Sequence, residues 1–99
     1  MEIKNHFGVY GVCLQDGKLF CIEKTRGPYQ HRYDLPGGSQ EPGEGLIETL
    51  KREVLEETGY SLSRYSNPRM YDVMVQEEGQ DFAVHHIMAF YDIALNFES

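Results

Sequence analysis

The chain of 99 residues has few cysteines, few basic residues and no long apolar run. Cys13 and Cys21 are its only cysteines, too few for a disulfide scaffold and without metal-ligand spacing. Nine Lys and Arg against 16 Asp and Glu give a formal charge of −7, which argues against nucleic acid or an anionic membrane as the main partner. Because no run could span a bilayer and the N-terminus has no signal pattern, we expect a cytoplasmic protein.

The overall amino-acid composition suits one globular domain. Hydrophobic residues make up 40% of the chain, and seven tyrosines and five phenylalanines supply large apolar side chains. A chain of this length buries about 60–65% of its unfolded surface, so we expect a modest core in a single domain over residues 1–99. An acidic protein that handles phosphates would need cations to mediate the contact.

A hairpin is predicted near the N-terminus. Two apolar runs, Val9–Leu14 and Lys18–Ile22, flank a tight turn at Asp16-Gly17. Both runs are apolar on both faces, which predicts central strands in a sheet covered on two sides. In this register the sulfurs of Cys13 and Cys21 point to opposite faces, so both cysteines are predicted to be free thiols.

A long loop and a helix follow. Residues 23–38 are rich in Gly, Pro, Tyr and basic side chains, as in loops that carry function. A helix is predicted from Glu44 or Gly45 to Thr58, closed by Gly59. The rest predicts sheet, giving an α+β pattern. The expected strands are a short one at Leu62–Tyr65, broken by Asn67-Pro68, and two longer ones at Met70–Val75 and Phe82–Leu95.

The predicted helix carries three crowded glutamates, Glu53, Glu56 and Glu57. In a glutamate-rich helix such a group is usually a solvated acidic face. Here, however, Glu57 falls within the apolar stripe of the helix, which consists of Leu46, Ile47, Leu50 and Val54. The like charges repel one another, and they sit at the C-terminal end of the helix, where its dipole disfavours anions. Carboxylates without His or Cys predict a hard ion, Mg²⁺ or Mn²⁺ before Zn²⁺.

Two further features accompany these glutamates. Arg52 lies four residues from both Glu48 and Glu56, so it is predicted to bridge them and to orient Glu56. An ordinary surface ion pair is an equally good interpretation of this spacing. The glycine pair Gly37-Gly38 lets a backbone carbonyl approach the same ion closely.

The segment from Gly38 to Tyr60 resembles a Nudix box, G-x5-E-x7-R-E-U-x-E-E-x-G-U, in which U is apolar. It supplies Gly38, Glu44, the Arg52-Glu53 pair, the Glu56-Glu57 pair and Gly59, with only Tyr60 at a position usually aliphatic. The resemblance covers 23 of 99 residues. It implies an α/β/α sandwich around a mixed sheet, with the box as loop–helix–loop. It also implies Mg²⁺- or Mn²⁺-dependent hydrolysis of a nucleoside diphosphate linked to another group.

The resemblance also assigns roles. Glu53, Glu56 and Glu57 would be metal ligands together with a backbone carbonyl near Gly38. Glu53 could also be the catalytic base, and Glu44 and Arg52 would support the site. In several branches of the family the base lies outside the box, and the candidates for that position here are Glu77, Glu78 and Glu98.

Other residues have two interpretations each. Arg26 and Arg32, with Lys24 less favoured, either bind substrate phosphates or are solvated loop charges. Tyr29 and Tyr33 either stack on a base or pack on their own domain. His85 and His86 are adjacent in a strand and face opposite ways, which disfavours a joint zinc site.

Family members usually continue through a further strand and a C-terminal helix, whereas this sequence ends after a predicted strand. We therefore expect one sheet flank to be uncovered, with dimerisation or strand exchange through it. The leading hypothesis is a nucleotide pyrophosphohydrolase acting on a small nucleoside diphosphate derivative. The alternative is a weakly active or inactive nucleotide-binding or regulatory module.

Overall fold

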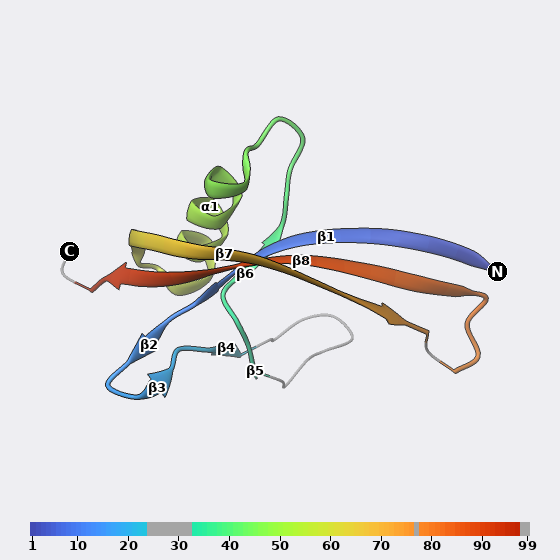
Figure 1. Ribbon diagram of the computed structural model, residues 1–99, viewed down its shortest axis with the longest axis horizontal. Helices are drawn as coiled ribbons and strands as arrows, with labels where there is room; N and C mark the ends of the chain where they lie inside the picture. The colour runs from blue at the N-terminus through green and yellow to red at the C-terminus, as the bar shows by residue number, and fades with distance from the viewer. Residues whose placement is uncertain (24–32, 77, 98–99) are drawn as a thin grey trace.

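A four-stranded mixed sheet forms the framework of the protein (Figure 1). The structure is a computed structural model that describes residues 1–23, 33–76 and 78–97. In the order β6-β1-β8-β7, the sheet contains β6 (Gly37–Ser39), β1 (Glu2–Val12), β8 (Phe82–Asn96) and β7 (Ser61–Val75). Strands β1 and β8 are parallel and the other neighbours are antiparallel. The predicted α+β fold with a mixed sheet is confirmed.

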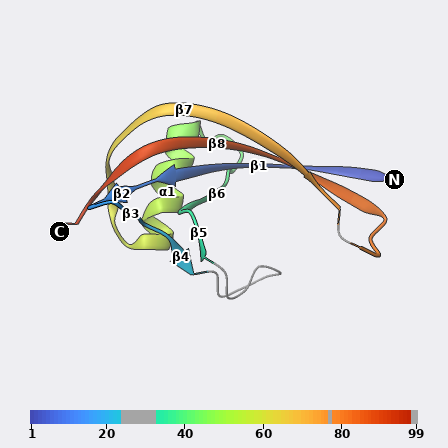
Figure 2. The same cartoon turned by 60° about the horizontal axis from the view of Figure 1, so that its bottom comes forward.

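One helix, α1 (Leu46–Thr58), packs on the sheet, and β7 and β8 arch over it in Figure 2. Gly45 is its N-cap, and Gly59 closes it in the left-handed conformation, with φ 78°, that glycine adopts freely. Leu50 and Val54 are fully buried, as the periodicity predicts. Leu46 is 37% exposed, at the edge of the interface. The core against α1 comes from β1 and β8, with Val9, Ala89, Tyr91, Ile93 and Leu95.

The predicted turn at Asp16-Gly17 is confirmed, but the hairpin is not central. It joins β2 (Leu14–Gln15) to β3 (Lys18–Leu19), and the Phe20 N–H donates to the Cys13 carbonyl at 2.8 Å. Leu14 is 69% exposed and Leu19 is 48% exposed. Strand β1 is central in the main sheet, between β6 and β8, and the chain leaves that sheet after Val12 before it forms the hairpin.

Two more short strands, β4 (Ile22–Glu23) and β5 (Tyr33–Asp34), pair with each other. In Figure 1, strands β2, β3, β4 and β5 lie below the four-stranded sheet and α1 lies above it. Both cysteines are free, as expected.

The predicted break at Asn67-Pro68 is wrong, because β7 runs through it as a β-bulge. Asn67 has φ 55°, and the register shifts between Ser66 and Arg69. The side chains of Asn67 and Arg69 donate to the two carboxylate oxygens of Asp92 on β8, at 3.0 and 2.9 Å. A proline is tolerated at a bulge on an edge strand, where its missing N–H leaves no ladder bond unmade.

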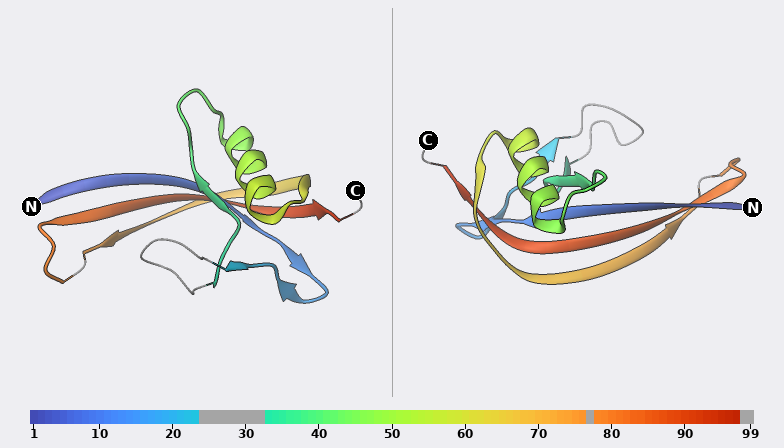
Figure 3. Two further views of the ribbon diagram at one scale, coloured as in Figure 1. Left: turned by 180° about the vertical axis from the view of Figure 1, so that it is seen from behind. Right: turned by 90° about the horizontal axis from the view of Figure 1, so that it is seen from above.

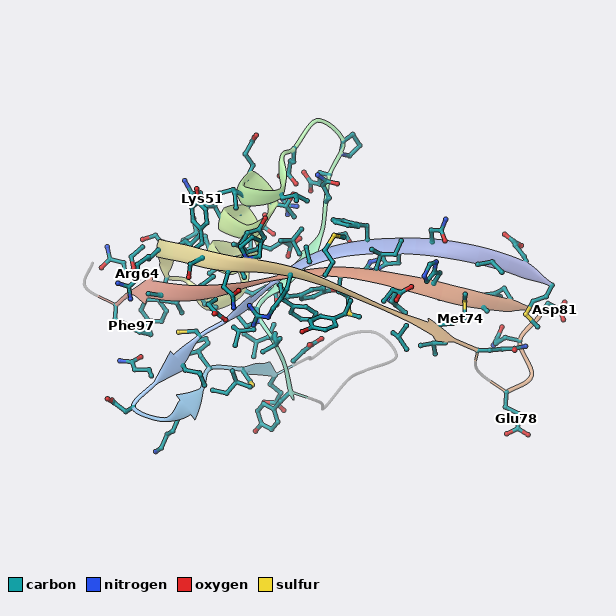
Figure 4. All side chains as sticks on the ribbon, viewed as in Figure 1. Lys51, Arg64, Met74, Glu78, Asp81 and Phe97 are labelled. Atoms are coloured by element: carbon teal, nitrogen blue, oxygen red, sulfur yellow. The ribbon has the colours of Figure 1, made fainter. Side chains whose placement is uncertain are left out.

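Beyond the helix, β1, β7 and β8 continue as a three-stranded arm (Figure 3). Figure 4 places Met74 and Asp81 along this arm and Lys51 on α1, at the other end of the molecule. Within the described ranges α1 is the single helix, so no described helix forms a second covering layer. It is also too short and too polar to cross a bilayer.

We predict that Leu50→Ala lowers the free energy of unfolding by about 2–5 kcal/mol, because it leaves a cavity between helix and sheet. Leu55 lies on the same helix and is 51% exposed, so Leu55→Ala should change it by no more than about 0.5 kcal/mol. Urea denaturation measures both. Equal losses in the two variants would contradict the assignment of the buried face.

Candidate active site

The site begins where β6 passes against α1. A Cβ on Gly38 would lie 2.6 Å from the Glu53 carboxylate, so a larger residue there would push the carboxylate away from this backbone. Gly37 has φ 146°, and a Cβ there would collide with the Val9 carbonyl oxygen of β1. The two glycines therefore bring the Glu53 side chain and the Gly38 backbone together.

Arg52 holds this contact with a forked set of hydrogen bonds. Its Nε donates to Glu44 Oε2 at 2.6 Å, and its Nη2 donates to Glu44 Oε1 at 2.9 Å. The same Nη2 donates to the Ser39 carbonyl at 2.9 Å, which ties α1 to β6. Its Nη1 donates to Glu53 Oε1 at 2.9 Å and, more weakly, to Glu56 Oε2 at 3.4 Å.

The predicted bridge from Arg52 to Glu48 and Glu56 is therefore only half right. Glu56 is in contact, but Glu48 Oε1 accepts from the Gly45 N–H at 3.3 Å and caps the helix. The main partner of Arg52 is Glu44, which precedes the N-cap. Helical spacing does not apply to a residue outside the helix, so the spacing rule could not find this pair.

Glu44 is enclosed by donors. Besides Arg52, it accepts from the Glu41 N–H and from the hydroxyl of the fully buried Thr49, both at 2.9 Å. The Arg52 side chain is the largest cause that lowers the pKa of Glu44 from 4.5 to about 2. The same bond raises the pKa of Arg52, so both groups are ionised at neutral pH. Sequence reasoning missed Thr49, because a threonine in a helix carries no motif of its own.

The three glutamates of the helix differ in exposure. The Glu53 side chain is 16% exposed, Glu56 is 58% exposed, and Glu57 is partly buried, as the angular spacing predicts. Burial is the largest cause that raises the pKa of Tyr10, followed by the charge of Asp34 and then by the charges of Glu57 and Glu53. These carboxylates therefore act on a tyrosine of the central strand β1.

The donor set fits a hard divalent ion. The Glu53 carboxylate lies against the Gly38 backbone, and Glu56 and Glu57 follow on the same helix. Oxygen donors of this kind suit Mg²⁺ or Mn²⁺. Within the described residues, no three His, Cys, Asp or Glu side chains converge as an assembled metal site. Instead, the Nη1 of Arg52 supplies the positive charge between Glu53 and Glu56.

A pocket of about 500 Å³ lies on the sheet face that carries the even-numbered side chains of β1 and β8. Tyr10 crosses its floor, since a Cβ on Gly8 would lie 2.5 Å from the Tyr10 hydroxyl oxygen. Phe90 lies beside it, with ring centroids 5.8 Å apart. The remaining lining residues are His6, Asp34, Leu35, Val73, Val75, His86 and Met88. Tyr10 thus belongs to the pocket and is influenced by the carboxylates as well.

The two adjacent histidines face opposite ways, as expected. His85 contacts Asp72 at 2.7 Å on one face. On the other face, His86 lies beside His6 of β1, with ring centroids 5.3 Å apart. The sequence missed the His6–His86 pair, because the parallel register of β1 and β8 has no local signal.

Several candidates lie elsewhere. Glu78 is in the turn at the far end of the arm, away from α1 (Figure 4), so the structure does not bring this candidate base to the site. Tyr33 is described and is 76% exposed. The other loop and terminal candidates lie outside the described residues, namely Lys24, Arg26, Tyr29, Arg32, Glu77 and Glu98.

A mixed sheet, a glycine-containing strand and a helix with clustered glutamates define a Nudix-type domain. The NUDIX domain family model matches residues 3–97, and the chain belongs to this family. It is 39% identical over 51 residues to an ADP-ribose pyrophosphatase of Methanocaldococcus jannaschii, covering 52% of this chain and 30% of that protein. It is 44% identical over 71 residues to a Bacillus subtilis protein provisionally named 8-oxo-dGTP diphosphatase, covering 66% and 46%.

Solved structures agree on the fold. A MutT NUDIX hydrolase from Burkholderia pseudomallei has a TM-score of 0.71 at 22% identity, covering 96% of this chain and 71% of that one. A NUDIX hydrolase from Nitrosomonas europaea has a TM-score of 0.72 at 27% identity, covering 96% and 62%. The matches with the two curated relatives span less than half of each relative's length.

We predict that the Glu44–Arg52 pair makes stability depend on acid. A carboxylate whose pKa falls from 4.5 to about 2 on folding stabilises the fold above pH 4.5. This contribution is lost as the pH falls from 4.5 towards 2. In Glu44→Gln the unfolding midpoint in urea should therefore be lower than in wild type at pH 7, with a difference that shrinks as the pH approaches 2. A constant difference across this range would contradict the assigned partner.

Proposed function

We propose that this domain hydrolyses the pyrophosphate linkage of a nucleoside diphosphate joined to another group, with Mg²⁺ or Mn²⁺ as cofactor. The observation that carries the proposal is the Glu53 carboxylate, held by Arg52 against the Gly38 backbone. A pyrophosphate linkage is negatively charged, and in an acidic protein a bound metal cation would offset the repulsion. The arrangement supports that chemistry better than it supports a solvated helix face.

The ion would be held by Glu53, Glu56 and Glu57 with a carbonyl near Gly38, and when bound it would neutralise phosphate charge and polarise the phosphorus. The protein's own contribution is positional. Glu44 fixes two nitrogens of Arg52, and the third nitrogen fixes Glu53 Oε1.

The other oxygen, Oε2, lies closer than Oε1 to the position that a Cβ on Gly38 would occupy. We assign it to accept the proton of the attacking water. The water oxygen then bonds to phosphorus, the anhydride P–O bond breaks, and the leaving phosphate takes the electron pair.

The sheet-face pocket is the proposed seat of the nucleoside. Its volume of about 500 Å³ lies in the range of small-molecule sites, and Tyr10 and Phe90 offer aromatic surface to a planar base. The names of the two curated relatives, for ADP-ribose and for 8-oxo-dGTP, support a purine nucleotide. Arg26 and Arg32 keep their proposed role at the substrate phosphates.

We predict Mg²⁺- or Mn²⁺-dependent hydrolysis in a screen of ADP-ribose, nucleoside triphosphates, dinucleotides and dinucleoside polyphosphates. Glu57→Gln should lower turnover at least about tenfold, because it removes a charged ligand. Glu48→Gln is the matched control: it removes the same charge from the same helix, while glutamine can still cap Gly45. Unchanged turnover in Glu57→Gln would refute the ligand assignment, and no hydrolysis of any compound would favour a nucleotide-binding module.

Self-association through the uncovered sheet is also proposed. Strand β7 is the outer strand of the sheet, and its exposed apolar side chains are Tyr65, Met70, Tyr71, Val73 and Met74. The bulge and Pro68 guard the first half of its free edge. Beyond Arg69, which pairs with Asp92, residues 70–75 have Asp72 as their single charge, and that carboxylate is engaged by His85. An edge with so little protection tends to pair with another strand.

Light scattering should therefore show a dimer in wild type and a shift to monomer in Met74→Lys, since a lysine blunts a strand edge. Leu14→Lys makes the same change at an exposed apolar residue of the hairpin and should leave the dimer intact. A wild-type monomer at all concentrations would contradict the proposal.

A further inference from the structure

One residue of β6 contacts both the pocket and the carboxylate site. The Ser39 hydroxyl is 2.8 Å from Nε2 of His6, which lines the pocket. The Ser39 carbonyl accepts from Arg52 Nη2 at 2.9 Å. Three hydrogen bonds therefore connect the pocket to the proposed base: His6 to Ser39, Ser39 to Arg52, and Arg52 to Glu53.

The chemistry of His6 sets the direction of the first bond. Its Nδ1 is buried and has no hydrogen-bond partner among the described residues. If Nδ1 carries no proton, an acceptor is left unpaired. If Nδ1 is protonated, the neutral ring buries an unpaired N–H donor there, and the imidazolium buries an unpaired charge. Burial, and then the neighbouring His86, lower the pKa of His6, which favours the neutral ring. We therefore assign the ring proton to Nε2, so that His6 donates and the Ser39 hydroxyl oxygen accepts.

Ser39 has few other constraints. Strand β6 has three residues, and Ser39 is the last of them, paired with Gly8 of β1. The backbone leaves the sheet immediately afterwards. Besides the ladder pairing, two hydrogen bonds hold Ser39: its hydroxyl bonds to His6 of the pocket, and its carbonyl accepts from Arg52 of the carboxylate site.

We propose that His6 is a positioning residue, which fixes Ser39 and through it the orientation of Arg52 and Glu53, so that the pocket and the carboxylate site are coupled. The step from Glu53 to catalysis rests on the function proposed above. The coupling of His6 to Arg52 does not depend on that function. Among the described side chains, His6 is the one that hydrogen-bonds Ser39 Oγ, so this bond is the specific link to remove.

The test is a double-mutant cycle on Mn²⁺ affinity, measured calorimetrically on the whole chain. Ser39→Ala removes the hydroxyl and keeps the backbone, and His6→Phe removes the donor and keeps a ring in the pocket. Each should weaken Mn²⁺ binding about fivefold, the effect of one typical hydrogen bond. The double variant should be no weaker than either single variant.

The matched control is His85→Phe. His85 is adjacent in sequence to His86 and contacts Asp72 on the face opposite the pocket, away from Ser39. Its Mn²⁺ affinity should equal that of wild type. Unchanged affinity in Ser39→Ala and His6→Phe, or fully additive losses, would overturn the coupling.

A second readout does not require metal or activity. The NMR resonance of the Arg52 Nε–H should move in Ser39→Ala and in His6→Phe of the metal-free protein, and should stay in place in His85→Phe. Absence of Mn²⁺ binding in wild type would refute the proposed function, and the Arg52 resonance would still decide the coupling. A resonance that does not move in either variant overturns it.

Discussion

The ion pair between Arg52 and Glu44 is the interaction on which the rest of the site depends. Glu44 holds two nitrogens of the guanidinium in a forked geometry, which fixes the plane of the group. The other contacts of Arg52, to Ser39 and Glu53, inherit their positions from that plane. Without this cation, the carboxylates gathered around it would repel one another in a partly desolvated place.

The hydrogen bonds of Arg52 can reach β6 only because core packing holds α1 at the right distance from the sheet. Leu50 and Val54 pack the helix on β1 and β8, and the glycines of β6 let the neighbouring Glu53 approach the backbone. A larger residue at Gly37 would collide with β1, and one at Gly38 would displace the Glu53 carboxylate. Packing and electrostatics therefore select the same residues, since the space that admits Glu53 is the space that a side chain on Gly38 would fill.

Local features were predictable from sequence, and long-range pairings were not. The ends of the helix, the turn at Asp16-Gly17 and the partial burial of Glu57 follow from periodicity and turn chemistry, and all are present. The partner of Arg52 lies outside the helix, and the bulge at Asn67 depends on Asp92 of another strand. The parallel register of β1 and β8, which places His6 beside His86 in the pocket, has no signal within either strand.

The alternation of side chains along β6 explains how two sites on opposite faces of the sheet can meet. Gly38 faces α1, where its missing side chain makes room for Glu53. Ser39 comes next and therefore points to the other face, where its hydroxyl meets His6. Because Ser39 bonds to His6 through its hydroxyl and to Arg52 through its carbonyl, this single residue contacts both the pocket and the arginine that holds the glutamates.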